Sequence, residues 1–470
     1  MVASMKRICL LWVAFLALLV GLPGMVRGGS NPTNSLAWDR AQDRMTVDIQ
    51  SLPLISFLQR FAAATGWHIF VEPDLTREIS AKFSELPTGE GLARLLGDLN
   101  FALLPDELDP KTRHLYVFRT NRRQATKAVE SPDKIPASAI PIPNELVVKL
   151  KPGSKINIDD LARSLGAKVI GRMDEQGAYL LKFDDAETTQ SARKELLANP
   201  DVQAVESNFN ADPPPQLSSS YTSNAAEPKL NPATNTSNCQ LVIGLIDTAT
   251  QPMGDNLAPF FKKPIQVAGN YTPDPGNITH GTAMATAMMQ MLQQKTGGTT
   301  SVRIQPVDVY GSSTTTTTFD VANGIIQAVN SGANVINLSL GSSGDSQFLH
   351  DTITSVAKRG IPIYAAAGNE PVTTPTYPAA YPEVVAVTAS DPNGQIASYA
   401  NRGSFIDLMA PGNDVVPYNG QSYFVQGTST STAFASGMAA GLADASHACA
   451  DQAQSLLVKS LKPAAAKSGQ

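Results

Sequence analysis

The sequence is poor in charge and contains no cluster of basic residues. Only 16% of its 470 residues are Asp, Glu, Lys or Arg, and the formal net charge is −5. Proteins that bind nucleic acid neutralise phosphates with grouped Lys and Arg side chains, so nucleic acid is not an expected partner. Hydrophobic residues make up 42% of the chain, which excludes a largely disordered protein. A chain of this length can hold two or three domains, each with its own core.

Cysteine is also scarce. Cys9 lies in the N-terminal segment considered next, which leaves only Cys239 and Cys449. In an oxidising compartment these two can pair, and the bridge would close a loop of about 210 residues, worth roughly 4 to 5 kcal/mol on the chain-entropy model. Two free, buried thiols are the alternative. We expect no metal and no cofactor; calcium is the open alternative, but no cluster of acidic loop residues supports a site for it.

Long hydrophobic runs are lacking, except at the N-terminus. The apolar run Ile8–Leu22 follows Lys6 and Arg7 and precedes a proline and small residues up to Gly28. This layout is typical of a secretory signal, and the run is shorter than the ~20 residues that a membrane-spanning helix needs. We therefore predict a signal peptide over residues 1–28 and a periplasmic or secreted protein with no membrane span after its removal. An uncleaved anchor is the alternative.

Two polar, proline-bearing stretches divide the rest of the chain. Their composition is typical of exposed linkers. The expected segments are, in order, a first module at 45–120, a linker at 125–143, a second module at 144–210, a linker at 211–238, a C-terminal domain at 239–462 and a tail at 463–470.

The first module predicts a small α+β domain with the order β-α-β-β-α-β. It opens with alternating residues at 45–49, and the following stretch has apolar residues at helical spacing up to Gly66. The module is similar to the short N-terminal domain of secretins and TonB-dependent receptors in Leu52-Pro53-Leu54, Thr65-Gly66 and the helix from Glu90 to Leu99. The resemblance implies contact with an envelope protein through residues 45–120. An unrelated small α+β domain is the alternative.

The second module predicts the same β-α-β-β-α-β order. Residues 145–153 form an alternating strand closed by a Pro-Gly turn, and a helix with apolar spacing ends at Gly166. The module resembles a subtilase propeptide in residues 145–153, in Leu165-Gly166-Ala167-Lys168-Val169 and in Asn199-Pro200-Asp201-Val202. The resemblance implies a domain that assists folding of a protease and blocks its cleft with its C-terminal strand. A generic ferredoxin-like domain is the alternative.

From Cys239 onward, continuous apolar runs alternate with amphipathic helical stretches. The runs cover residues 241–246, 335–338, 361–366 and 384–388. Strands with this pattern are buried on both faces, so the C-terminal domain is expected to be α/β with a doubly wound, mostly parallel sheet. In such folds functional residues lie at the C-terminal ends of strands and at helix N-termini.

Four polar residues occupy positions of this kind. Asp247 directly follows the first apolar run, His280 opens a helical stretch, Ser429 lies at the start of a helix rich in small residues, and Asn369 lies just past the third run. An acid that orients an imidazole base beside a serine can form a hydrolytic triad. A helix N-terminus and a nearby amide can stabilise a developing oxyanion.

These residues stand in motifs that occur in the order and with the spacing typical of subtilases. The motifs are Ile-Asp-Thr, His-Gly-Thr, Asn-Leu-Ser-Leu-Gly, Ala-Ala-Gly-Asn and Gly-Thr-Ser. The region is identified as a member of the subtilase family, which implies a subtilisin-like fold. The resemblance implies that Asp247 orients His280, that His280 acts as general base and then acid, that Ser429 attacks, and that Asn369 stabilises the oxyanion.

The resemblance also implies a substrate cleft. Its lining residues would be Ser339, Leu340, Gly341, Ala366 and Gly368, and its apolar wall favours an apolar residue before the cleaved bond. The sequence departs from the usual family pattern at Ala249, Thr430 and Ala433, but none of these changes removes a group that the chemistry needs.

The sequence as a whole predicts an exported serine endopeptidase. It would hydrolyse proteins or peptides through an acyl-enzyme and would be made as a zymogen that interacts with its own propeptide. A cut within 211–238 would remove that propeptide. The alternative is an envelope interaction or regulatory protein in which the protease fold is locked or vestigial.

Overall fold

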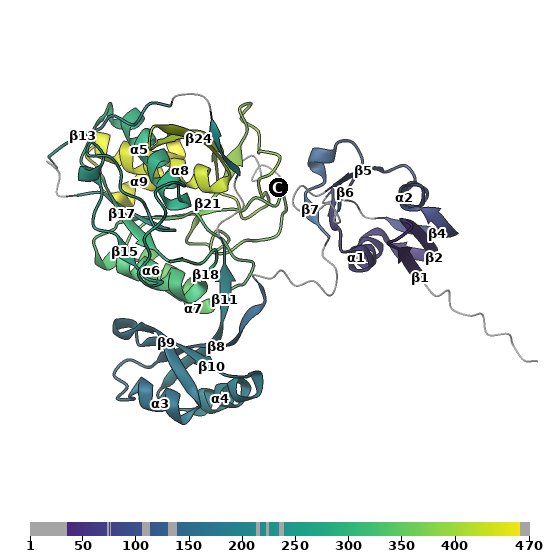
Figure 1. The fold of residues 1–470 in the computed structure, drawn as a ribbon, viewed down its shortest axis with the longest axis horizontal. Coiled ribbons are helices and arrows are strands. Elements are labelled where there is room, and N and C mark those ends of the chain that lie inside the picture. Colours follow the sequence, from purple (N-terminus) through teal and green to yellow (C-terminus); the bar gives the residue numbers. More distant parts are fainter. Residues whose placement is uncertain are drawn as a thin grey trace, which may run out of the picture.

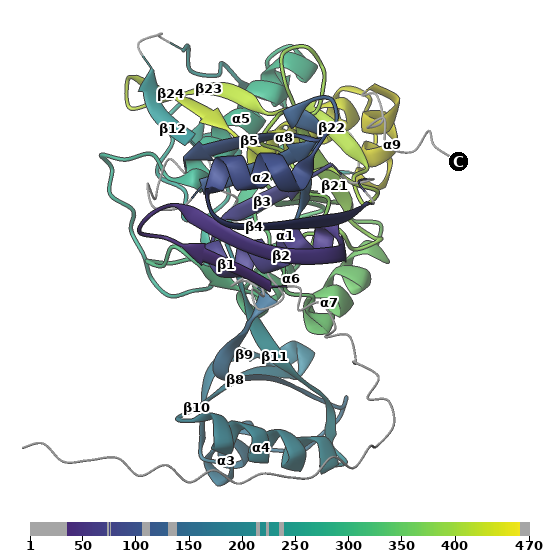
Figure 2. The ribbon, with the colours of Figure 1, turned by 90° about the vertical axis from the view of Figure 1, so that its right-hand side faces the viewer.

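The computed structural model describes residues 35–72, 75, 77–105, 113–129, 139–212, 217–221, 225–234 and 239–460. The predicted signal peptide, the predicted tail and parts of both predicted linkers lie outside the described residues. Figures 1 and 2 show the first module beside the C-terminal domain and the second module at another of its sides. None of the helices within the described ranges is long and apolar enough to span a membrane.

The first module contains two helices and two small sheets. Its elements are β1 (Ser35–Asp39), β2 (Arg44–Pro53), α1 (Leu54–Thr65), β3 (His68–Val71), β4 (Glu78–Pro87), α2 (Thr88–Leu96), β5 (Asn100–Pro105), β6 (Arg113–Phe118) and β7 (Lys127–Ala128). The sheets have the orders β1-β2-β4 and β5-β6-β3-β7. The apolar face of α1, with Phe57 and Phe61 fully buried, forms the centre of the core.

The predicted order β-α-β-β-α-β is incomplete for this module, because it lacks β1, β5 and β7. The last of these lies within the predicted linker 125–143 and pairs antiparallel with β3. Edge strands such as β1 and β7 are held by their pairing partners rather than by a strong pattern of their own. Helix α2 covers Thr88–Leu96 and is followed by Gly97, so it begins and ends earlier than the predicted helix from Glu90 to Leu99.

The second module has the predicted order β-α-β-β-α-β. Its elements are β8 (Pro141–Leu150), α3 (Ile158–Ser164), β9 (Ala167–Met173), β10 (Ala178–Phe183), α4 (Ala186–Ala198) and β11 (Val202–Ala211). Both helices begin at side-chain caps, since Asn157 and Asp185 accept hydrogen bonds from backbone N–H groups in the first turn. The sheet order is β18-β11-β8-β10-β9, and β18 (Thr316–Thr317) belongs to the C-terminal domain. The sheet of the second module therefore continues into the C-terminal domain.

The C-terminal domain is built on a seven-stranded parallel sheet, which confirms the predicted fold class. The order is β15-β17-β14-β19-β20-β21-β22, and the strands are β14 (Val242–Asp247), β15 (Ile265–Gln266), β17 (Arg303–Asp308), β19 (Val335–Leu338), β20 (Ile363–Ala366), β21 (Val385–Ser390) and β22 (Leu408–Pro411). Residues of α5 (His280–Thr296) and α8 (Thr428–Ala445) share one core with this sheet. Residues of α6 (Thr318–Asn330) and α7 (Gln347–Ala357) share the other. Helices thus cover both faces.

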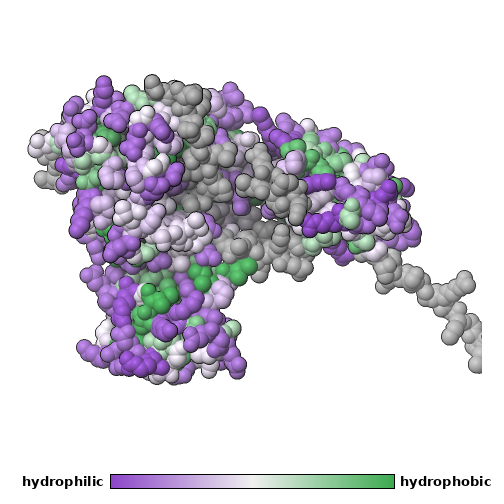
Figure 3. All heavy atoms as spheres, in the orientation of Figure 1, coloured by the Kyte–Doolittle hydropathy of each residue, from purple (hydrophilic) through white to green (hydrophobic). Residues whose placement is uncertain are grey.

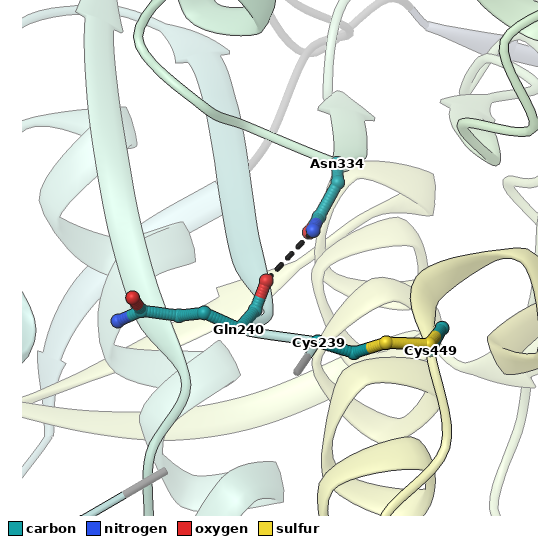
Figure 4. Close-up of a disulfide and its surroundings, with 4 residues drawn as sticks. All are labelled: Cys239, Gln240, Asn334 and Cys449. Atoms are coloured by element: carbon teal, nitrogen blue, oxygen red, sulfur yellow. Dashed lines mark hydrogen bonds between the residues drawn. A yellow bond between two sulfur atoms is a disulfide. The ribbon is translucent and has the colours of Figure 1, made fainter. Parts of the chain in front are cut away.

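Smaller elements complete the domain. They are β12 (Leu217–Tyr221), β13 (Asn231–Pro232), β16 (Thr299–Thr300), β23 (Asn413–Tyr418), β24 (Gln421–Gln426) and α9 (Ala450–Ser460). A disulfide joins Cys239, just before β14, to Cys449, just before α9, with 5.1 Å between their Cα atoms (Figure 4). The bridge ties the start of the domain to its last helix.

Candidate active site

Asp247 and His280 form a buried pair at the C-terminal edge of the parallel sheet. Asp247 is the last residue of β14, and His280 is the first residue of α5, whose cap Thr279 accepts a hydrogen bond from Thr282 N. The Nδ1 atom of His280 lies 2.7 Å from Oδ1 of Asp247, and the two side chains are only 8% and 2% exposed. The carboxylate can therefore hold the imidazole ring in one orientation.

The approach of α5 to β14 depends on a glycine. Gly281 N donates to Thr248 Oγ1 over 2.9 Å, and a Cβ atom at position 281 would lie only 2.3 Å from the Thr248 carbonyl oxygen. A side chain here would push the start of α5 away from the sheet. Gly281 thus allows His280 to reach Asp247.

The loop before α5 is held by Gln251, a residue that no sequence motif singles out. Its buried side chain accepts a hydrogen bond from Thr279 N over 3.0 Å and donates to the carbonyl oxygens of Asp274 and Asn277 over 2.7 Å each. Its partners lie more than twenty residues further along the chain, so this role becomes visible only in the folded structure.

Ser429 lies in the first turn of α8 and is fully buried. Its Oγ donates to the Ser339 carbonyl oxygen over 3.3 Å. The Nε2 atom of His280 is buried and has no hydrogen-bond partner among the described residues. The structure thus joins Asp247 to His280 directly, whereas the Ser429 hydroxyl has a different partner.

Asn369 stands opposite the start of α8. Its Oδ1 atom accepts from Thr428 N over 2.9 Å, and the preceding Gly368 N donates to Thr428 Oγ1 over 3.1 Å. An amide donates hydrogen bonds through its nitrogen, so Nδ2 is the atom of this side chain that can serve an oxyanion. Gly368 has φ +106°, and a Cβ atom there would lie 2.4 Å from Asn401 Nδ2, so the loop requires glycine at this position.

Asn401, which likewise stands in no recognisable sequence motif, holds the loop that carries Asn369. The buried Asn401 donates from Nδ2 to the Ala367 carbonyl oxygen over 2.7 Å and accepts at Oδ1 from Glu370 N over 2.8 Å. Its backbone N–H donates to the Gly368 carbonyl oxygen over 2.9 Å. One side chain therefore fixes the backbone on both sides of Asn369.

A second buried chain of polar groups supports the backbone of Ser429. Ser436 Oγ donates to Asn337 Oδ1 over 3.0 Å, Asn337 Nδ2 donates to Ser339 Oγ over 3.0 Å, and Ser339 Oγ donates to the Ser429 carbonyl oxygen over 3.1 Å. All four residues are fully buried. Satisfied networks of this kind rigidify their surroundings, so α8 and β19 are locked together at the site.

The second module reaches the predicted substrate cleft. Asp212 N donates to the Gly341 carbonyl oxygen over 2.9 Å, and Gly341 N donates back to the Asp212 carbonyl oxygen over 3.0 Å. One residue earlier, Ala211 pairs with Thr316 of β18. Of the other predicted lining residues, Leu340 and Ala366 are buried and can form walls. A strand of the chain itself therefore occupies the backbone-pairing position at Gly341, as an extended peptide would.

Two further acidic groups lie near this site. Burial raises the pKa of Asp308, and the nearby charge of Asp247 adds to this increase; the two residues are register partners in adjacent strands. Burial also raises the pKa of Asp212. Within the described part of the chain, no group of three or more His, Cys, Asp and Glu residues could hold a metal ion.

Comparisons with known proteins agree with this geometry. Residues 224–469 match the model of the subtilase family, and residues 128–208 match that of the fervidolysin N-terminal prodomain. The chain is 36% identical to the thermophilic serine proteinase of Bacillus sp. (strain AK1) over 36% of this chain and 44% of the relative. It is 34% identical to thermitase of Thermoactinomyces vulgaris over 43% of this chain and 74% of the relative. The chain thus spans less than half the length of the first of these relatives.

A solved structure shares the fold over about two thirds of the chain. Fervidolysin from Fervidobacterium pennivorans, described as a keratinolytic enzyme related to subtilisin, superposes with a TM-score of 0.51 at 18% identity. The match covers 66% of this chain and 56% of fervidolysin. At this identity the likeness speaks for the fold alone.

Proposed function

Because this chain belongs to the subtilase family, we propose that it is a subtilisin-like serine endopeptidase made as a zymogen. The second module is its prodomain. The observation that carries the proposal is the 2.7 Å contact between His280 Nδ1 and Asp247 Oδ1 at a site where His280 Nε2 is buried without a partner in the described structure. That nitrogen is the atom a general base must offer to a nucleophile.

In the proposed mechanism Ser429 is the nucleophile. Its hydroxyl turns from the Ser339 carbonyl oxygen to His280 Nε2, which takes the proton as Oγ attacks the substrate carbonyl carbon. Asp247 stabilises the imidazolium that forms. The oxyanion accepts hydrogen bonds from the Asn369 amide and from the backbone N–H of Ser429 at the N-terminus of α8.

The second half of the reaction restores the enzyme. The carbon–nitrogen bond breaks, His280 gives its proton to the leaving amine, and Ser429 keeps the acyl group. Water then attacks the acyl carbon with His280 again as base, the ester bond to Ser429 Oγ breaks, and the acid product leaves as Oγ takes back the proton from His280. Protein or peptide substrates would pair with Gly341 as Asp212 does now, and the buried Leu340 and Ala366 favour an apolar residue before the cleaved bond.

The prodomain keeps the enzyme inactive in this proposal. Figure 3 shows hydrophobic residues gathered where the second module meets the C-terminal domain. Two polar side chains of β11 reach across this junction to helix N-termini: Glu206 accepts from Ser346 Oγ and Phe348 N at α7, and Asn208 Oδ1 accepts from Phe319 N at α6. Activation requires a cut between residues 212 and 238, followed by release of the prodomain.

We further propose export to the periplasm or the medium through the signal peptide, and an envelope protein as partner of the first module. Both rest on the sequence patterns at residues 1–28 and 45–120. Mass spectrometry of the mature N-terminus tests the export signal, and a chain that retains Met1 in the membrane fraction would contradict it.

The proposed activity is tested by following intact mass over time for the signal-less wild type beside Ser429→Ala, each with and without a fluorophosphonate probe. We expect the wild type alone to shorten to a product that starts within 212–238 and to take up the probe at Ser429. If neither chain shortens or is labelled, even after the prodomain has been digested away, the protease fold is locked and the proposal fails.

A further inference from the structure

The first module lies beside the C-terminal domain (Figures 1 and 2), and it contacts the loop that carries Asn369. Phe70 of β3, Ala125 before β7 and Val372 of the loop form one buried cluster, with exposures of 8%, 2% and 5%. Tyr116 and Phe118 of β6 border it. Val372 lies three residues after Asn369, so the apolar contact is made on the loop that carries this candidate oxyanion donor.

A polar contact accompanies the apolar cluster. Arg402 donates from Nη1 to the Arg123 carbonyl oxygen of the first module over 3.3 Å, and from Nη2 to the Ala397 carbonyl oxygen over 3.0 Å. Its backbone N–H donates to the Val372 carbonyl oxygen over 2.9 Å. The same arginine therefore touches both the first module and the residue that the module covers.

The contacts continue from this interface to Asn369. Arg402 follows Asn401 directly, and Asn401 binds the backbone at Ala367, Gly368 and Glu370. The segment 367–372 thus rests on Asn401 and Arg402 on one side and on the first module at its end. A loop with few apolar contacts opens easily. The cluster at Val372 gives segment 367–372 an apolar contact and therefore opposes its opening.

We propose that the first module positions the segment 367–372, which carries Asn369, and that it acts through Val372 and Arg402. The inference rests on the proposed role of Asn369. An oxyanion donor is effective only when it is held in place before the reaction, and a displacement of about 1 Å can cost up to about 10²-fold in rate. Loss of the module's contact should therefore slow the chemical step without removing any catalytic group.

Self-cleavage of the full chain provides the rate to be measured, because it is a first-order step that occurs while the module is attached. Ala125→Arg breaks the contact from the module's side, and Val372→Asp breaks it from the loop's side. We expect both to slow self-cleavage by roughly 3- to 30-fold. Ala63→Arg, at an exposed position of α1, is the matched control and should process at the wild-type rate. Fluorescence of the contacting Trp38 and Trp67 verifies that the module is folded in each variant.

Hydrogen exchange of the same variants in a Ser429→Ala chain gives a readout that does not need activity. We expect faster exchange of the backbone amides at 368–372 in Ala125→Arg and Val372→Asp, but not in Ala63→Arg. Unchanged exchange overturns the inference, and so does faster exchange with an unchanged self-cleavage rate. If the wild type does not cleave itself, the proposed processing is wrong, and the exchange at 368–372 alone decides whether the module orders this loop.

Discussion

The two ends of the Asn369 side chain have different roles: its oxygen accepts from Thr428 N, and in the proposed mechanism its nitrogen donates to the reacting oxygen. We expect Asn369→Ala to lower kcat by about 10²- to 10³-fold with little change in KM, a range adopted from subtilisin rather than obtained from this structure. Steady-state kinetics of the processed enzyme check this, with thermal melting to show that α8 stays folded. An unchanged kcat would mean that another group stabilises the oxyanion.

A substitution at Gly281 tests whether the close approach of α5 to β14 sets the geometry of the site. In Gly281→Ala the new Cβ would lie 2.3 Å from the Thr248 carbonyl oxygen, so the helix start and His280 must shift. We expect a loss of at least about 10²-fold in kcat/KM and a destabilisation of about 1 to 3 kcal/mol. Gly254→Ala, where a Cβ meets nothing within 4 Å, is the control. Equal activity of the two variants would refute the argument.

The raised pKa of Asp308 makes the free energy of unfolding depend on pH, and the direction of the pKa shift fixes the sign of this dependence. A carboxyl that is harder to ionise when buried makes the folded state favourable at low pH, and this contribution is lost as the pH rises through the raised pKa. Asp308→Asn keeps an oxygen that can accept from Tyr310 N and Gly311 N but removes the charge.

We therefore expect urea unfolding of the Asp308→Asn variant, in a Ser429→Ala background, to lose less stability between pH 4 and pH 7 than the parent chain does. The exposed Asp255 provides the control Asp255→Asn, which should follow the parent. A variant that loses as much stability as the parent over this range would show that Asp308 is not the group responsible.

At the scale of elements, strand β11 is joined to helix α7 by the half-buried carboxylate of Glu206. Glu206 accepts from Ser346 Oγ over 2.6 Å and from Phe348 N over 3.1 Å, and burial raises its pKa. Caps of this kind contribute about 1 kcal/mol. We expect Glu206→Ala in a Ser429→Ala chain to speed hydrogen exchange at Gly341 and in β11 by on the order of tenfold.

The pH dependence of this junction follows from the same shift. Because the pKa of Glu206 is raised in the docked state, docking is most favourable at low pH and weakens as the pH rises through the raised value. Burial raises the pKa of Asp320, at the start of α6, to about 6, and the charge of Glu145 in β8 adds to this increase. The part that comes from Glu145 exists only in the docked state and acts in the same direction. Glu206→Gln keeps an acceptor for Phe348 N and should flatten the exchange profile at Gly341 between pH 5 and pH 7. An unchanged profile would assign the pH dependence to other groups.

The sequence predicts best those elements that carry their own periodic pattern. The buried strands of the parallel sheet, α1 and the whole second module have such patterns, and the family motifs single out Asp247 and His280, which the fold brings together. Strand β1 is a short edge strand held by the adjacent β2. Strand β7 is fixed by its pairing with β3, far earlier in the chain, so its local pattern does not reveal it. The same holds for Gln251, Asn401 and Glu206, whose partners lie 20 or more residues away and become visible only when the chain is folded.

At the scale of the whole molecule, the three modules meet around one site. The segment that ends the second module pairs with Gly341, a predicted lining residue of the substrate cleft. The first module contacts Val372, three residues after Asn369. The two modules lie at different sides of the C-terminal domain (Figures 1 and 2). A cut between residues 212 and 238 would leave both modules on one fragment with two points of attachment, and linked attachments hold more tightly than either alone. We therefore expect the cut fragment to co-elute with the C-terminal domain, and Ala125→Arg to speed its release severalfold over Ala63→Arg. Release at equal rates would show that only the prodomain holds the fragment.

The disulfide between Cys239 and Cys449 closes a loop of 210 residues around nearly the entire C-terminal domain. Its largest effect is on the unfolded chain, whose freedom it restricts by up to roughly 4 to 5 kcal/mol on the chain-entropy model. It also fixes the start of the domain, just before β14, to the segment between α8 and α9, so that the strand bearing Asp247 is tied to the helix that follows Ser429. We expect a Cys239→Ser/Cys449→Ser double variant, compared with the parent in a Ser429→Ala background, to unfold several degrees lower. Dithiothreitol should lower the melting temperature of the parent but not of the variant. If reduction leaves the parent unchanged, the two thiols are not bridged in solution and the domain is held by its core alone.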